Sequence, residues 1–218
     1  MVFLHHRKDN VRRFFGRFTG IQWAALGLML IGVVFMGVKG AGMLNMAREA
    51  RYAVENNFSA GDLDPTLIRP WMNIRYIASA YAVPQKYLFD ALEVTPGKET
   101  SLIALERLNK QQNLGYTGKK PAILQKVVEA IDTYRANPQV TGLIEREVQE
   151  WMTIQYLANS TGIAADELAA GTGVAVDGNL NKPIGVVADQ TGYPGGARGL
   201  SQALDDYIKQ HLPQPEQP

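Results

Sequence analysis

The sequence WMNIRYIA, residues 71–78, recurs 80 residues later as WMTIQYLA, residues 151–158. The correspondence continues without a gap through Val83 and Leu88, which match Ile163 and Leu168. Trp-Met is a rare dipeptide, so an uninterrupted match of this length indicates an internal duplication.

Each copy has the pattern of a short helix, a tight turn and a second helix. Asn73 and Thr153 are good N-cap residues, and apolar residues follow them at helical spacing. The turns fall at Ala82-Val83-Pro84 and Gly162-Ile163-Ala164, ahead of second helices over 85–92 and 165–170. This spacing of small, β-branched and leucine residues resembles the helix-turn-helix, which implies a bihelical unit more strongly than it implies DNA binding.

A second, more degenerate bihelical unit follows each copy. We expect helices over 102–112 and 121–134 in the first half and over 184–192 and 200–211 in the second, with Gly115-Tyr116 matching Gly192-Tyr193. A linking helix over 140–149 and a loop over 171–181 complete the expected elements. The fold class is therefore all-α: an N-terminal transmembrane helix plus a soluble domain of tandem duplicated bihelical units, divided into 61–137 and 138–212.

The N-terminal region contains a long uncharged segment. No charge occurs in the 21 residues from Phe18 to Val38, which as a helix span about 30 Å, the thickness of a bilayer's hydrocarbon core. Trp23 lies where an interfacial aromatic anchor belongs. We therefore predict a transmembrane helix over 18–42, a stalk helix over 43–60, and a flexible proline-rich tail over 213–218.

Two other interpretations of this segment are a buried core helix and a cleaved signal peptide. Gly40-Ala41-Gly42 has the small residues that a cleavage site requires. A core helix rarely runs this far without charge behind a basic flank, so a retained span is the favoured interpretation.

Basic residues flank the predicted span unevenly. The tail over 1–17 carries five of them, and fewer follow the uncharged segment closely: Arg7, Lys8, Arg12, Arg13 and Arg17 before it, Lys39, Arg48 and Arg51 after it. The positive-inside rule then places the N-terminus in the cytoplasm and the repeat domain outside the inner membrane. The basic tail is also expected to contact anionic lipid.

The residues needed for common catalytic and metal sites are scarce. Cysteine is absent, and the three histidines, His5, His6 and His211, lie near the chain ends. Paired carboxylates such as Asp166 and Glu167 are typical of solvated helix surfaces. The glycine-rich segment over 192–199 lacks the Lys-Ser/Thr of a phosphate loop. We therefore predict no enzyme, no cofactor, no metal and no small-molecule substrate.

Trp71 and Trp151 open the two copies at equivalent positions. They are expected either to anchor each unit on its neighbour or, with Trp23, to bind a partner. Nucleic acid is an unfavourable partner because residues 45–218 carry 16 basic and 20 acidic residues, a net charge of −4.

The WM-initiated unit also resembles short repeats of bacterial membrane-anchored proteins without assigned activity. The resemblance covers about 25 residues in each half, and it implies a small helical module and no catalytic residue. The sequence favours an accessory or scaffolding subunit of a larger membrane complex, for example an energy-transducing one, that contacts other membrane-protein subunits. The alternative is a membrane-tethered helix-turn-helix regulator that binds DNA or a regulatory protein.

Overall fold

The computed structural model of this chain describes residues 51–52, 55–56 and 63–212. The chain divides into two compact units, Met1–Asn56 and Asn57–Pro218. In the first unit Arg51, Tyr52 and Glu55 are helical, and the Arg51 Nε and Glu55 Oε1 atoms form an exposed ion pair of 2.7 Å. The predicted transmembrane helix (18–42), the basic tail (1–17) and the C-terminal tail (213–218) lie outside the described residues.

The second unit is mostly helical and contains both copies of the duplication. Repeat 1, residues 63–137, consists of one-turn 3₁₀ helices η2 (Pro65–Leu67) and η3 (Thr100–Leu102), helices α3 (Ile74–Tyr81), α4 (Gln85–Ala91), α5 (Leu105–Gln111) and α6 (Ile123–Ala136), and a hairpin of β1 (Tyr116–Thr117) and β2 (Lys120–Pro121). Repeat 2, residues 138–212, consists of α7 (Ile154–Thr161), α8 (Ala165–Gly171), α9 (Ile184–Thr191) and α10 (Gly196–His211).

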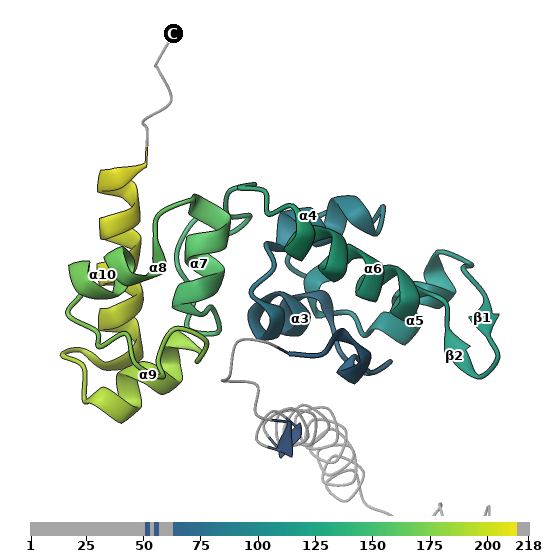
Figure 1. Ribbon diagram of the computed structural model, residues 1–218, viewed down its shortest axis with the longest axis horizontal. Coiled ribbons are helices and arrows are strands. Elements are labelled where there is room, and N and C mark those ends of the chain that lie inside the picture. Colours follow the sequence, from purple (N-terminus) through teal and green to yellow (C-terminus); the bar gives the residue numbers. More distant parts are fainter. Residues whose placement is uncertain (1–50, 53–54, 57–62, 213–218) are drawn as a thin grey trace, which may run out of the picture. The chain divides into compact units, whose positions relative to one another are not determined.

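These elements confirm the predicted bihelical units. Each repeat has two helix pairs, α3–α4 and α5–α6 in repeat 1 and α7–α8 and α9–α10 in repeat 2 (Figure 1). The Asn73 side chain accepts a hydrogen bond from the Tyr76 N–H, and the Thr153 side chain does the same for the Tyr156 N–H. Such N-caps stabilise a helix by about 1 kcal/mol each.

The rare Trp-Met dipeptide has its explanation in the methionine. Met72 and Met152 are completely buried, and each sulfur accepts a backbone N–H from three residues earlier, that of Arg69 or Gln149, at 3.4 Å in both repeats. Each methionine carbonyl accepts an N–H from the second helix pair, that of Leu105 or Ile184, at 2.8 Å. The dipeptide therefore joins the two helix pairs of its own repeat.

The two repeats share their left-handed turns as well as their helices. Three pairs of equivalent residues have positive φ: Ala82 and Gly162, Glu93 and Gly173, Asn113 and Gly192. In each of these pairs the glycine belongs to repeat 2. The last pair corrects the predicted match of Gly115-Tyr116 to Gly192-Tyr193. Leu114 and Tyr193 donate equivalent hydrogen bonds, to the Asn109 and Ala188 carbonyls, so the true match is Asn113-Leu114.

The linking helix predicted over 140–149 is wrong. This segment, hereafter the linker, has no helix, and Gly142 has a φ of +79°. Its backbone groups bond to distant elements: the Gly142 N–H donates to the Ser160 carbonyl at 2.9 Å, and the Val148 N–H donates to Asp205 at 3.2 Å. Bonds to α7 and α10 therefore replace the i→i−4 bonds that a helix would need.

Apolar side chains from every helix pair fill the core. The predicted matches Val83 with Ile163 and Leu88 with Leu168 are buried in both repeats. Among the residues that the structure describes, no helix is long and apolar enough to cross a bilayer.

Candidate functional site

The structure places Trp71 and Trp151 in the same local setting. Each is partly buried, and each ring lies against the tyrosine five residues later, at 5.5 Å from Tyr76 and 5.4 Å from Tyr156, with interplanar angles of 56° in both pairs. The third predicted partner-binding residue, Trp23, and the basic residues Arg7, Lys8, Arg12, Arg13 and Arg17 lie outside the described residues.

Trp151 also contacts the other repeat. The Arg75 guanidinium of α3 lies over its indole, 5.9 Å from the ring centroid, and the Ser79 hydroxyl donates to its carbonyl at 2.8 Å. A cation over an indole contributes about 0.5–2 kcal/mol, depending on how far the pair is desolvated. Through these contacts Trp151 holds repeat 2 on α3 of repeat 1, which is what a tryptophan that anchors one unit on its neighbour would do.

Two further hydrogen bonds contribute to this contact between the repeats, hereafter the seam. The Asn159 amide of α7 donates to the Ala82 carbonyl at 2.6 Å, and the Gln85 amide donates to the Glu145 carboxylate at 3.0 Å. Repeat 2 thus binds repeat 1 at the α3–α4 turn through α7 and through the linker. Figure 1 shows α7 on the side of repeat 2 that faces repeat 1.

A buried polar cluster surrounds the Gln85–Glu145 bond of the seam. Gln85 and Tyr156 are each 1% exposed, and the second oxygen of Glu145 is buried without a hydrogen-bond partner, as is the Thr141 hydroxyl. Burial, reinforced by the negative charge of Glu145, raises the pKa of Tyr156 well above its ordinary value, and nearby Gln85 and Ser160 offset part of the rise. The Tyr156 hydroxyl is protonated at neutral pH, as an ordinary tyrosine is, so the rise in its pKa has consequences only at alkaline pH.

This cluster fits a structural task better than a catalytic one. Buried polar groups that need one another as hydrogen-bond partners favour a single docking geometry of the two repeats. Any other geometry would leave a group unpaired, at a cost of about 1–3 kcal/mol. Sequence reasoning did not identify the cluster, since Gln85 and Glu145 lie 60 residues apart and in no common motif.

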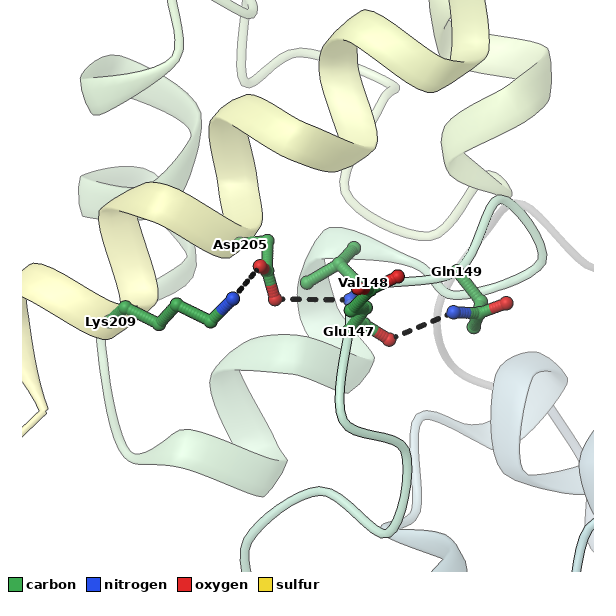
Figure 2. A network of polar contacts seen from close by, with 5 residues as sticks. All are labelled: Glu147, Val148, Gln149, Asp205 and Lys209. Atoms are coloured by element: carbon green, nitrogen blue, oxygen red, sulfur yellow. Dashed lines mark hydrogen bonds and ion pairs between the residues drawn. The ribbon is translucent and has the colours of Figure 1, made fainter.

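A second network ties the linker to α10. Figure 2 shows Asp205 of α10 accepting the Val148 N–H with one carboxylate oxygen and pairing with Lys209 through the other, while the Gln149 amide donates to the Glu147 carbonyl. The linker is thus held at both ends, by α7 at Gly142 and by α10 at Val148. These bonds fix the linker, which leads directly to Trp151, on α7 and α10.

The β1–β2 hairpin of repeat 1 has no strand counterpart in repeat 2. Its base is fixed by Asn109, which is 1% exposed: its amide donates to the Gly115 carbonyl at 2.8 Å and its oxygen accepts the Ile123 N–H at 3.0 Å. The equivalent residue in repeat 2 is Ala188, and residues 193–199 there form a turn and the start of α10. The hairpin and its buried asparagine occur together in one repeat and are absent together from the other.

Acidic and basic side chains also differ between the repeats. Residues 61–137 carry ten basic and eight acidic residues, a net of +2, and residues 138–212 carry four basic and nine acidic residues, a net of −5. On equivalent exposed positions of α5 and α9, Arg107 and Lys110 of repeat 1 are replaced by Val186 and Asp189. The mild acidity predicted for the whole domain is therefore concentrated in repeat 2.

Within residues 51–52, 55–56 and 63–212, no group of three or more His, Asp or Glu side chains is placed to hold a metal ion. Comparison of this chain with protein-family models, with curated proteins and with solved structures finds no match.

Proposed function

We propose that this chain is a non-catalytic, single-pass membrane protein that serves as an accessory or scaffolding subunit of a larger membrane complex. The predicted span over 18–42 would hold the helical module at the bilayer, with the N-terminus in the cytoplasm and the module outside. The module would bind other membrane-protein subunits through its surface.

The seam is the observation that carries this proposal. It joins two repeats of the same architecture through bonds that differ in kind: a cation over the Trp151 indole, the Asn159 amide on the Ala82 carbonyl, and the buried Gln85–Glu145 pair. A body fixed in this way keeps two chemically different surfaces at a constant separation. That is the geometry a scaffold needs.

The acidic repeat 2 offers the better surface for a protein partner. Val176 and Val186 are 39% and 41% exposed, and each lies within three residues of an exposed acid, Asp177 or Asp189. Apolar contact gives affinity and charge gives orientation in a typical interface, so a partner with a basic, partly apolar patch is expected here.

The helix-turn-helix regulator is less well supported. The second helix of repeat 2, α8, exposes Asp166 and Glu167, and Lys86 on α4 is paired with Asp90 at 3.1 Å. A DNA-reading helix needs basic side chains that are available to phosphate and bases.

The test is to solubilise the full chain in mild detergent and identify what purifies with it. The proposal predicts co-purification with other membrane proteins in fixed proportion, and a monodisperse monomer would overturn it. The double variant V186R/D189K transfers the repeat 1 residues of α5 to equivalent exposed positions of α9, so it should release the partner and leave the fold intact. The control variant E129K/D132K places two new lysines on the exposed face of α6 and should retain the partner.

A further inference from the structure

The hairpin of repeat 1 is built from residues that contribute little to the core. Between the left-handed residue Asn113 and the first buried residue of the final helix, repeat 1 uses residues 114–122, and repeat 2 uses residues 193–199 for the same connection. From Gly115 to Lys120 every residue is exposed, and only Pro121 is buried. The chain thus forms an ordered projection whose side chains face solvent.

The projection is rigid at its base and narrow at its tip. Besides the two bonds of Asn109, the Ala122 N–H donates to the Gly115 carbonyl at 3.2 Å. The strands pair Tyr116 with Pro121 and Thr117 with Lys120, and a two-residue turn, Gly118-Lys119, connects them. In Figure 1 the hairpin lies at the end of repeat 1 that faces away from repeat 2.

Positive charge and an aromatic ring gather on this projection and on α5 beside it. Residues 105–121 carry four basic residues and one acidic residue, a net of +3, and the corresponding residues 184–199 carry one of each. Tyr116 is 51% exposed. The pKa of Lys110 is raised mainly by its bond with Glu106 and further by Tyr116, which therefore lies near Lys110.

We infer that the β1–β2 hairpin and the adjacent face of α5 dock on anionic lipid headgroups at the surface of the bilayer. The inference rests on the proposed function, since it needs a module tethered to the membrane. The 24 residues between the uncharged segment and Leu63 reach at most about 80 Å, so the module stays close to the bilayer.

Lipid fits this surface better than an acidic protein does. Tyrosine favours the headgroup layer because its ring is apolar and its hydroxyl polar, and each lysine near an anionic surface contributes about 1 kcal/mol. Gly118 and Lys119 at the tip are exposed, and they offer a protein partner little apolar surface to bury. A fluid headgroup layer can surround such a tip without shape complementarity.

The test uses the absence of cysteine from the chain. The full chain carrying T117C is labelled with an environment-sensitive fluorophore and reconstituted in nanodiscs of phosphatidylcholine, with or without phosphatidylglycerol. We expect a blue shift of the emission, and quenching by a headgroup-linked nitroxide, only when phosphatidylglycerol is present. The matched control is V186C, an exposed position on α9 of repeat 2, where neither lipid should change the emission.

Charge variants separate a specific surface from general attraction. In the T117C background, K119E/K120E removes both lysines of the hairpin tip and should lower the docking equilibrium constant by at least about 30-fold, since two lysine contributions of about 1 kcal/mol each are lost. The control R146E/R198E makes the same change in net charge at exposed positions of repeat 2 and should leave docking unchanged.

The outcomes distinguish this inference from the proposed function. If the chain integrates in nanodiscs and co-purifies with partners, but the label at 117 stays in water with phosphatidylglycerol, the lipid inference alone is overturned. Equal quenching at 117 and 186, or a change at 117 that requires an added acidic polypeptide or nucleic acid, also overturns it. If alkaline carbonate extracts the chain from membranes, the chain does not span the bilayer, and the proposed function is overturned instead.

Discussion

Glu93 and Gly173 occupy equivalent positions in the two repeats and have the same left-handed backbone, with φ of 56° and 72°. Each ends the second helix of its repeat, and the following N–H returns to an equivalent carbonyl: Val94 to Phe89 and Val174 to Ala169, both at 2.9 Å. The duplication thus preserves a turn whose backbone favours glycine, even where repeat 1 has a glutamate.

This pair gives the first prediction. E93G should stabilise the module by about 0.5–1 kcal/mol, because the cost of a left-handed L-residue exceeds the extra entropy of glycine in the unfolded chain. By the same balance G173A should destabilise it by about 0.5–1 kcal/mol, and the loss is purely conformational because an added Cβ meets nothing within 4 Å. Thermal unfolding followed by circular dichroism measures both, and E129G on helix α6 is a control that should destabilise. Stabilisation by G173A would contradict the argument.

The Gln85–Glu145 pair gives the second prediction. Q85A should destabilise the module by about 1.5–3 kcal/mol, since it removes the donor to a carboxylate whose other oxygen already lacks a partner. A double-mutant cycle with E145A should show a coupling energy of about 0.5–3 kcal/mol. Hydrogen exchange should rise in the linker and in α7 before it rises in α9. Additive single-variant effects would show that the pair does not hold the seam.

Tyr156 gives the third prediction, for alkaline pH. Because its pKa in the folded protein lies above the ordinary 10.0, the protonated hydroxyl favours the folded state. The stabilisation is complete below about pH 10 and is lost as pH rises above it, by up to about 1.4 kcal/mol per pH unit. Y156F should therefore flatten the alkaline fall in unfolding free energy relative to wild type. Parallel curves for the two proteins would exclude Tyr156 as the cause.

Asn109 gives the fourth prediction. N109A leaves the buried Ile123 N–H without its acceptor and removes one of the two donors to the Gly115 carbonyl, so it should cost about 1–3 kcal/mol and loosen the hairpin. Tryptic cleavage after Lys119 should become several-fold faster, and cleavage after Arg146 in the linker should not change. A hairpin equally resistant in N109A would show that strand pairing alone holds it.

Gly171 gives the fifth prediction. A Cβ at this position would overlap the ring of Tyr207 on α10, whose hydroxyl also donates to Glu167 at 3.2 Å. G171A should therefore destabilise repeat 2 by about 1–3 kcal/mol. In a Y207A background the same substitution should cost little, because the obstructing ring is gone. Similar losses in both backgrounds would assign the effect to the helix and not to the ring.

Local patterns predicted most of the helices for identifiable reasons. The N-caps Asn73 and Thr153, the turns at Ala82 and Gly162, and the apolar periodicity of each pair depend on neighbours in sequence, and all are confirmed. The second bihelical unit of each half is confirmed too, although α10 begins at Gly196, four residues before the predicted start at Leu200.

The predictions failed where distant groups compete for the backbone. The segment over 140–149 has helix formers, yet its N–H groups donate to Ser160 and Asp205. The hairpin was not expected because Tyr116–Pro121 lacks the alternating apolar residues of a strand, and it is held by the buried Asn109. Neither partner set is visible in a local pattern.

By itself, therefore, the sequence determined a duplicated helical module, since caps, turns and periodicity act within a few residues of one another. Only the tertiary structure decided how the copies join, because the seam pairs residues up to 77 positions apart. It also decided what distinguishes the copies. Charge averaged over the chain hides the basic hairpin of repeat 1 and the acidic surface of repeat 2, and only the fold shows that these charged side chains are exposed on separate elements.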